Sequence, residues 1–174
     1  MNNSDKHSLR KKALEMLKKT ESVYVDDIDI GDAALVLAYI PLKSECDISP
    51  FIEKCIKNGR CVAVPTSDYK VFAVLDVDWK GKLYRLENGT YSVESREHIN
   101  IEKIDKKTVI LVPGLLFTLD GRRLGRGHGF YDRVLACVDG NNLVRTIGIC
   151  KKNQLVEDLP TEYNDKKVCE LSIH

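Results

Sequence analysis

Residues 123–133 hold the side chains best suited to chemistry in this chain. Three glycines alternate there with a cation and an imidazole, and an aromatic pair and an acid follow at once. Glycines let a backbone approach a ligand closely and adopt positive φ angles. Where such a loop enters a helix, unpaired N–H groups and the helix dipole favour an anion. The candidate residues are Arg123, Leu124, Gly125, Arg126, Gly127, His128, Gly129, Phe130, Tyr131 and Asp132.

This glycine loop differs from the two common nucleotide-binding motifs. No Walker A sequence can be aligned, and Phe130 stands where the dinucleotide fingerprint has its third glycine. Arg123 and Arg126 supply cations, and Asp132 supplies a possible metal ligand. The pattern therefore predicts a phosphate site with a metal beside it. The alternative is a flexible surface loop with incidental arginines.

Two cations near the start of the chain, Lys6 and Arg10, extend the apolar stripe of an expected helix. At about 100° per residue they lie within roughly 40° of each other, in line with Ala13 and Leu17. Lys6 would also lie in the first turn, where the helix dipole disfavours a cation. An anionic ligand would account for both features. A surface position with buried side-chain stems is the alternative.

Three acids could contribute to the same site. Asp132 belongs to the glycine loop, and Asp165 lies in a C-terminal loop after Pro160. Magnesium usually takes one or two carboxylates together with water and substrate phosphates, so these two are candidate metal ligands. Alternatively, Asp132 is a first-turn acid that complements the helix dipole, and Asp165 is a surface acid. Glu45 should emerge after the strand expected at 33–40, where an exposed loop acid is the alternative.

The ring-bearing residues allow two interpretations each. His128 could bind an anion when protonated or position a group when neutral, or it could be an exposed loop histidine. Phe130, Tyr131 and, earlier in the chain, Tyr91 could stack on a ligand ring or be core aromatics.

Hydrophobic periodicity predicts the elements that position these residues. Buried strands are expected at 33–40, 61–64, 108–112, 144–149 and 167–172, and helices at 6–19, 49–58 and 130–138. Two meander strands, 71–77 and 83–86, are expected around a turn at Lys80 and Gly81, whereas 94–107 shows no pattern. Buried strands alternating with helices predict a three-layer α/β/α fold with a mainly parallel sheet.

Local signals set the helix faces and ends. The second helix should have Ser49 as its cap and Pro50 at its first position, with Gly59 closing it. The loop at 113–128 leaves the C-terminal end of a strand and is long, as functional loops often are. The apolar stripe expected for the first helix comprises Leu9, Ala13, Met16 and Leu17.

Composition narrows the class of protein. We expect 174 residues to form a single domain, residues 1–174, with a real core. The 27 Lys and Arg residues nearly balance the 26 Asp and Glu residues, which argues against a nucleic-acid or membrane binder. No apolar run approaches the roughly 20 residues of a membrane span. With no secretory signal visible, we expect a monomeric, cytoplasmic protein that acts on small molecules.

The cysteines indicate a reduced protein. None of the six forms a C-x-x-C pair, so a zinc ribbon or thioredoxin motif is not expected. A disulfide framework is typical of small secreted chains instead. Those within apolar patterns, predicted to be core residues, are Cys55, Cys61, Cys137, Cys150 and Cys169.

Six segments spread along nearly the whole chain are distinctive: KHSLR at 6–10, YIP at 39–41 with Glu45, CVAVP at 61–65, VPGLLF at 112–117, DGRRLGRGHGFYD at 120–132 and LPTEYND at 159–165. In this order they resemble the 5-formyltetrahydrofolate cyclo-ligase family, also called methenyltetrahydrofolate synthetases. The stretch from 112 to 133 is the most specific part of this resemblance.

The resemblance implies a reaction and a set of residues for it. It implies ATP- and Mg²⁺-dependent conversion of 5-formyltetrahydrofolate to 5,10-methenyltetrahydrofolate, with release of ADP and phosphate, on a three-layer α/β domain. Implied ATP-binding residues are Lys6, Arg10, Arg123, Leu124, Gly125, Arg126, Gly127, His128, Gly129, Phe130 and Tyr131. Implied folate-binding residues are Ile40, Glu45, Arg126, Gly127, His128, Gly129 and Phe130. The implied metal ligands are Asp132 and Asp165, and the implied catalytic residues are Arg126, His128 and Tyr131.

The chain also departs from the family pattern. The family often has glycine or lysine where His128 stands and tyrosine where Phe130 stands, and the segment around Phe72 and Tyr91 matches poorly. These differences bear on substrate affinity and rate.

Two other functions stay open. One is a non-catalytic nucleotide- or RNA-binding relative, because fold alone does not determine function. The other is a kinase or ligase for a different small substrate.

Overall fold

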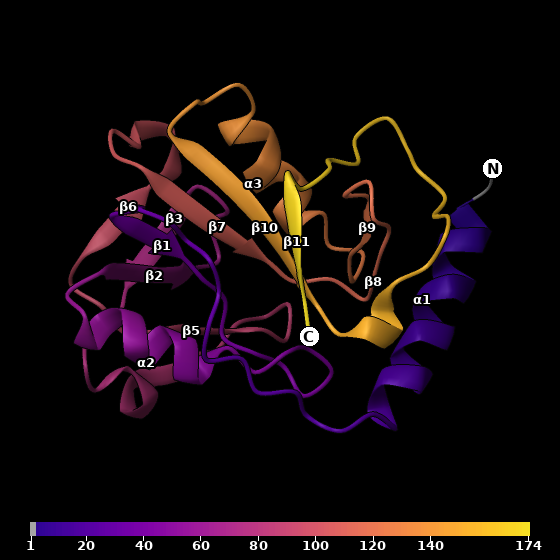
Figure 1. Cartoon of the computed structure of the whole chain (residues 1–174), viewed down its shortest axis with the longest axis horizontal. Helices are drawn as coiled ribbons and strands as arrows, with labels where there is room; N and C mark the ends of the chain where they lie inside the picture. Colours follow the sequence, from indigo (N-terminus) through magenta and orange to yellow (C-terminus); the bar gives the residue numbers. More distant parts are fainter. Residues whose placement is uncertain (1–2) are drawn as a thin grey trace.

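A seven-stranded, mainly parallel sheet lies at the centre of the computed structural model, which describes residues 3–174 (Figure 1). Its strands are β1 (Leu35–Leu37), β2 (Cys61–Pro65), β3 (Val71–Val74), β6 (His98–Asn100), β7 (Thr108–Val112), β10 (Val144–Cys150) and β11 (Glu170–Ile173). They are ordered β11-β10-β7-β1-β2-β3-β6. Strands β1, β2, β7, β10 and β11 pair in parallel, whereas β3 and β6 continue the sheet antiparallel at one edge.

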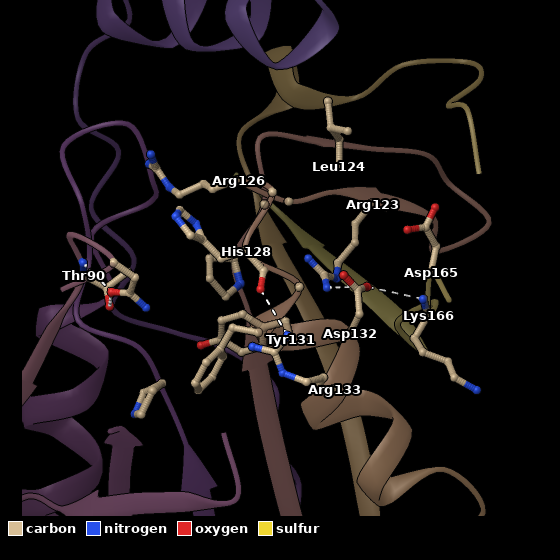
Figure 2. A pocket seen from close by; sticks show the side chains of 18 of the residues that line it. Thr90, Arg123, Leu124, Arg126, His128, Tyr131, Asp132, Arg133, Asp165 and Lys166 are labelled. Atoms are coloured by element: carbon tan, nitrogen blue, oxygen red, sulfur yellow. Dashed lines mark hydrogen bonds and ion pairs between the residues drawn. The ribbon is translucent and has the colours of Figure 1, made fainter. Parts of the chain in front are cut away.

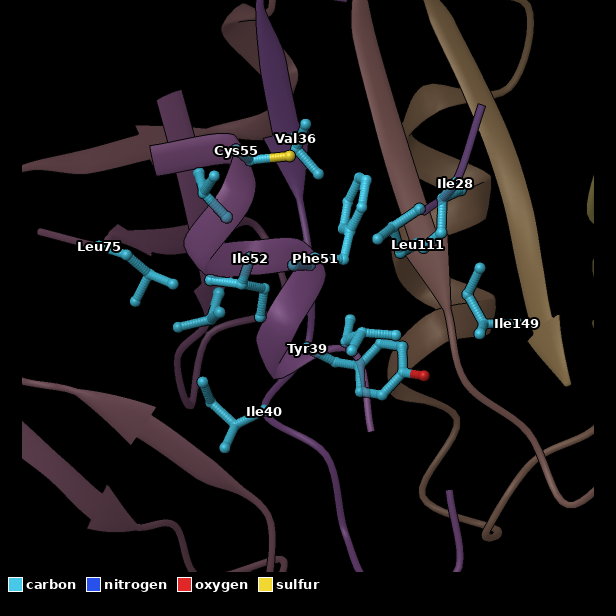
Figure 3. Close-up of a cluster of buried hydrophobic side chains, with 14 of the residues drawn as sticks. Ile28, Val36, Tyr39, Ile40, Phe51, Ile52, Cys55, Leu75, Leu111 and Ile149 are labelled. Atoms are coloured by element: carbon cyan, nitrogen blue, oxygen red, sulfur yellow. The ribbon is translucent and has the colours of Figure 1, made fainter. Parts of the chain in front are cut away.

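The side chains of the sheet alternate between two helical layers, because successive residues of a strand point to opposite faces. On one face, Val36 and Leu111 share a core with Phe51 of α2 (Ser49–Lys57), as Figure 3 shows. On the other face, Leu37 shares a core with Val134 of α3 (Phe130–Val138). The predicted three-layer α/β/α fold is therefore confirmed.

Helix α1 (Asn3–Lys18) covers neither face of the sheet but lies beside it (Figure 1). Its residues Ala13 and Leu17 pack against Leu115, Leu124 and Leu159. Strands β8 (Leu116–Phe117) and β9 (Arg123–Leu124) form a small hairpin. Leu115 directly precedes this hairpin, and Leu124 belongs to it. This packing carries the first turns of α1 toward the glycine loop. None of the helices in the described part of the chain is long and apolar enough to cross a membrane.

The expected hairpin around Lys80 and Gly81 is wrong. Strand β3 pairs with β2 and β6, while β4 (Leu83–Arg85) pairs with β5 (Tyr91–Val93). Between β3 and β4 the chain forms a 3₁₀ helix, η1 (Trp79–Lys82), which buries the indole of Trp79. Because the ring is buried, the chain leaves the sheet after β3 and does not turn directly back to pair β3 with β4.

The segment without a pattern, 94–107, contains β6 and a further short helix. That helix is η2 (Ile101–Lys103), and another, η3 (Lys152–Gln154), follows β10. Ile101 is buried, so a single apolar anchor holds this otherwise charged stretch against the core.

Three local expectations are also wrong. The cap of α2 is Ile48 rather than Ser49, because the amide of Ser49 donates to the Asp47 carboxylate at 2.9 Å and Ser49 already lies in the helix. Met16 is exposed on α1, where Leu14 packs instead. Cys169 is exposed because its neighbour Val168 points into the core, and successive residues of an extended chain point to opposite sides.

The β8–β9 hairpin depends on one glycine, and replacing Gly121 with alanine should destabilise the protein. Gly121 has a φ of 85°, and a Cβ there would lie 2.3 Å from the carbonyl oxygen of Val168. Left-handed strain together with overpacking predicts a loss of about 3 kcal/mol in the free energy of unfolding, measurable by urea denaturation. Gly31→Ala is the matched control, since Gly31 has a φ of 54° but no atom within 4 Å. Equal losses in both variants would contradict the steric explanation.

Candidate active site

A pocket of about 820 Å³ lies where the chain leaves the carboxyl ends of the parallel strands. Ile40 follows β1 there, Pro65 ends β2, and Pro113 follows β7. Ligands of open α/β sheets bind at this edge, and the volume is in the upper part of the range of about 300–1,000 Å³ for small-molecule sites. The sequence-predicted residues that line this pocket are Lys6, Arg10, Ile40, Glu45, Arg123, Leu124, Gly125, Arg126, Gly127, His128, Gly129, Phe130, Tyr131, Asp132 and Asp165.

The main chain of the glycine loop carries unpaired hydrogen-bond donors. Gly127 and Gly129 have φ angles of 99° and 63°, and Gly129 caps α3 without a side chain. Among the described residues, no acceptor takes a hydrogen bond from the amides of residues 125–132. Because a helix N-terminus with free amides attracts negative charge, this loop has the chemistry of an anion site.

Arg123 and Asp132 form an ion pair inside the pocket (Figure 2). Arg123 Nη2 donates to Asp132 Oδ1 at 2.8 Å, and the arginine side chain is 4% exposed. Burial lowers the pKa of Arg123, although a guanidinium stays charged in proteins. Its Nε finds no hydrogen-bond partner within residues 3–174. The guanidinium therefore keeps an unused donor for a ligand.

Helix α1 brings Lys6 and Arg10 into the same pocket. Lys6 Nζ lies 2.5 Å from Asp165 Oδ2 and 3.4 Å from Glu162 Oε1, and its side chain is 5% exposed. Arg10 Nε donates to the carbonyl of Gly125 at 3.1 Å. The surface interpretation of Lys6 is wrong, because packing of α1 on the hairpin turns this side chain inward.

Arg126 reaches across the pocket to the loop after β1. Its Nε lies 3.3 Å from Glu45 Oε1, and its Nη2 donates to Ser44 Oγ. Glu45 also accepts the amide of Leu42 at 2.9 Å and is 8% exposed, so the exposed-loop interpretation is wrong. Burial raises the pKa of Glu45, although the charge of Arg126 opposes the shift.

Two buried phenols lie near this carboxylate. Burial raises the pKa of both Tyr131 and Tyr39, so each stays a neutral hydrogen-bond donor. The Tyr39 hydroxyl donates to the carbonyl of Cys46 at 3.2 Å, whereas the Tyr131 hydroxyl has no partner in the described part of the chain. Tyr131 can therefore donate to a ligand.

Sequence reasoning missed several pocket residues. Arg133 and Lys166 directly follow candidate acids, and this adjacency is the signal that could have found them. Asn88 and Thr90 give no local signal, because only the β4–β5 pairing brings their turn to the pocket. Ser44 bonds Arg126 without lining the pocket. Further lining residues are Tyr39, Gly114, Ala136, Glu162, Tyr163 and Asn164.

The segment around Phe72 and Tyr91 divides between core and pocket. Phe72 is fully buried in the sheet core, whereas Tyr91 lines the pocket.

Comparison with known proteins agrees with this geometry. The chain matches the model of the 5-formyltetrahydrofolate cyclo-ligase family over residues 3–174. It belongs to this family. Membership places the chain among the ligases.

Proteins that carry the name of this family occur in distant organisms. A 5-formyltetrahydrofolate cyclo-ligase of Mus musculus is 40% identical over 141 residues, which cover 76% of this chain and 70% of the relative. One of Mycolicibacterium smegmatis is 30% identical over 135 residues, covering 75% and 68%. The NMR structure of Aquifex aeolicus 5,10-methenyltetrahydrofolate synthetase aligns with a TM-score of 0.64 at 26% identity, covering 99% of this chain and 81% of that one.

The buried carboxylate of this cyclo-ligase family member should make stability depend on pH. Because burial raises the pKa of Glu45 above its ordinary 4.5, ionising it costs more in the folded chain than in the unfolded chain. This cost is absent below the unfolded-state pKa near 4.5, grows as the pH rises from there to the folded-state pKa, and is constant above it. Glu45→Gln should therefore gain stability relative to the unmodified protein between mildly acidic and mildly alkaline pH, measured by urea denaturation. Glu157→Gln is the control, because Glu157 is exposed. The same gain in stability with pH in this variant would contradict the burial of Glu45 as the cause.

Proposed function

We propose that this protein converts 5-formyltetrahydrofolate to 5,10-methenyltetrahydrofolate, consuming ATP and requiring Mg²⁺. Membership in the cyclo-ligase family supports the reaction class and the use of ATP. The observation that carries the proposal is the run of unpaired amides at residues 125–132, surrounded by cations in one pocket.

The phosphate side of the proposed site lies between α1 and the start of α3. We assign the ATP phosphates to the amides of the glycine loop and to Lys6, Arg10 and Arg123. Each of these cations is bound by the protein itself: Lys6 by Asp165, Arg10 by Gly125 and Arg123 by Asp132. Phosphate oxygens would replace these acceptors with little rearrangement, because the cations already converge on the pocket.

The folate side of the proposed site is the wall formed by Ile40, Glu45 and the β4–β5 turn. Ile40 offers an apolar contact, and Glu45 and Thr90 offer polar ones. Arg126 and residues through Phe130 would cover the reacting group between the two substrates. His128 is exposed at this loop and could bind an anion or position a group.

The proposed chemistry activates a poor leaving group. The formyl oxygen on N5 attacks the γ-phosphorus of ATP and ADP departs, which leaves a phosphorylated imidate. N10 then attacks the activated carbon, loses its proton, and phosphate leaves as the ring closes. In this scheme Arg126 neutralises charge on the transferred group, and the free hydroxyl of Tyr131 donates to an oxygen of it.

The carboxylates fit a magnesium ion that is completed by phosphates. Within residues 3–174 no group of three His, Cys, Asp or Glu side chains could hold a metal alone. Asp132 and Asp165 each accept their hydrogen bonds on one oxygen, and the other oxygen has no partner among the described residues. One or two carboxylates with phosphates and water are the usual set for Mg²⁺, which would neutralise phosphate charge there.

The decisive test mixes the purified protein with 5-formyltetrahydrofolate, ATP and Mg²⁺ and follows absorbance of the methenyl product. We expect product and ADP to form together. Folded protein that forms no product beside a working control enzyme sinks the proposal. Nucleotide binding without folate-dependent ADP release would favour the non-catalytic alternative.

Within that assay, Arg126→Ala should lower kcat/KM by about 100-fold, as for removal of one transition-state donor. The fold should persist, since the polar contacts of Arg126 within residues 3–174 are those to Ser44 and Glu45 in the loop after β1. Exposed Arg96→Ala is the matched control and should keep full activity. An unchanged rate in the first variant would remove the role assigned to Arg126.

If phosphate oxygens replace Asp165 as the partner of Lys6, removing the charge of Asp165 should change the affinity for ATP. Asp165→Asn should bind metal-free ATP about tenfold more tightly, because a buried cation left without its partner gains most from a phosphate. The same variant should lose the further gain that Mg²⁺ gives. Calorimetric titration of ATP with and without Mg²⁺ measures both effects. Glu162→Gln is the control, since Glu162 is half-exposed and farther from Lys6. Weaker binding of metal-free ATP to Asp165→Asn would contradict the replacement of Asp165 by phosphate at Lys6.

A further inference from the structure

Arg133 links the glycine loop to a segment outside the pocket. Its Nη1 donates to the carbonyl oxygen of His128 at 3.2 Å, a contact drawn in Figure 2. Its guanidinium carbon lies 5.2 Å from the ring centroid of Tyr69, in the turn between β2 and β3. Tyr69 is half-buried against the core beneath α3 and does not line the pocket. The ring thus offers the guanidinium a fixed platform.

The position of Arg133 constrains the backbone where the unpaired amides lie. The amide of Arg133 donates to the carbonyl of Gly129 at 3.1 Å, and its side chain holds the carbonyl of His128. Two successive carbonyls are therefore fixed by one residue. Because the carbonyl and the N–H of a trans peptide point in opposite directions, holding the His128 carbonyl also sets the direction of the Gly129 amide.

A side chain at the cap would disturb this arrangement. A Cβ on Gly129 would lie 3.2 Å from Arg133 Nη1, and Gly129 has a φ of 63°. The guanidinium therefore occupies the space beside the cap that only glycine leaves open.

We propose that Arg133 is a positioning residue that fixes the phosphate-binding loop, and that Tyr69 acts on the site only through Arg133. This inference rests on the proposed nucleotide site. It adds Tyr69, which lies outside the pocket, to the residues that determine affinity for ATP. One guanidinium makes both contacts at once, with its carbon over the Tyr69 ring and its Nη1 bonded to the His128 carbonyl, a geometry that a planar group allows.

The test is a double-mutant cycle on binding of Mg²⁺·ATP, measured by calorimetry without any folate. Arg133→Ala should weaken binding about tenfold, from the loss of a hydrogen bond to a charged donor. Tyr69→Leu should weaken it about threefold, the size of an exposed cation–π contact. The double variant should bind as Arg133→Ala does, because Tyr69 then has nothing to hold. Additive losses, or no loss in Tyr69→Leu, overturn the proposal.

Three further variants separate positioning from charge and from general stability. Tyr69→Phe keeps the ring and should bind normally. Arg133→Lys keeps the charge but not the planar fork, so it should bind as weakly as Arg133→Ala; normal binding would mean that Arg133 contacts phosphate directly. Lys70→Met removes the other cation near the Tyr69 ring, 5.9 Å from its centroid, and should have no effect.

Failure of this inference is distinguishable from failure of the proposed function. If the protein binds ATP but forms no methenyl product, the cycle still reports on Tyr69 and Arg133. If product forms and the variants bind ATP normally, the proposed reaction stands and the positioning role is refuted. Thermal unfolding of each variant identifies losses that come from a destabilised fold.

Discussion

The burial of cations against carboxylates, above all Lys6 against Asp165, is the physical constraint that shapes the pocket. A buried ammonium needs a charged partner, since removing either member of a buried pair leaves an uncompensated charge. This pair joins α1 to the C-terminal loop, across 159 positions of the sequence. Arg123 and Asp132 form a second buried pair, and the charge of Asp165 also acts on Arg123. The pocket thus neutralises its own cations with acceptors that anionic ligands can replace.

Hydrophobic packing makes this electrostatic arrangement possible. Ala13 and Leu17 fix α1 on the β8–β9 hairpin, and the same helix face then presents Lys6 and Arg10 to the loop that follows β9. Helix α3, which covers a sheet face, brings its first residues to the same pocket. The site is therefore built by two helices in different positions, α3 on the sheet and α1 beside it.

Much of the fold was predictable from local pattern. Apolar runs correctly located β1, β2 and β7, because strands buried on both faces need apolar residues at nearly every position. Prediction failed where a tertiary contact overrode a local signal. Trp79 is buried in a 3₁₀ helix, so the turn at Lys80 never joins two paired strands. Met16 and Cys169 are apolar enough for the core, but the packing leaves them outside.

The sequence by itself determined the residue types of the site and the family to which they point. A glycine loop entering a helix, with cations and an acid beside it, is readable from spacing alone because its donors belong to one segment. Tertiary structure alone decided which charge pairs with which. It also decided that Ser44, Thr90 and Tyr69 lie in or behind the site. Those assignments rest on contacts between segments far apart in the chain, and no local pattern records where distant segments meet.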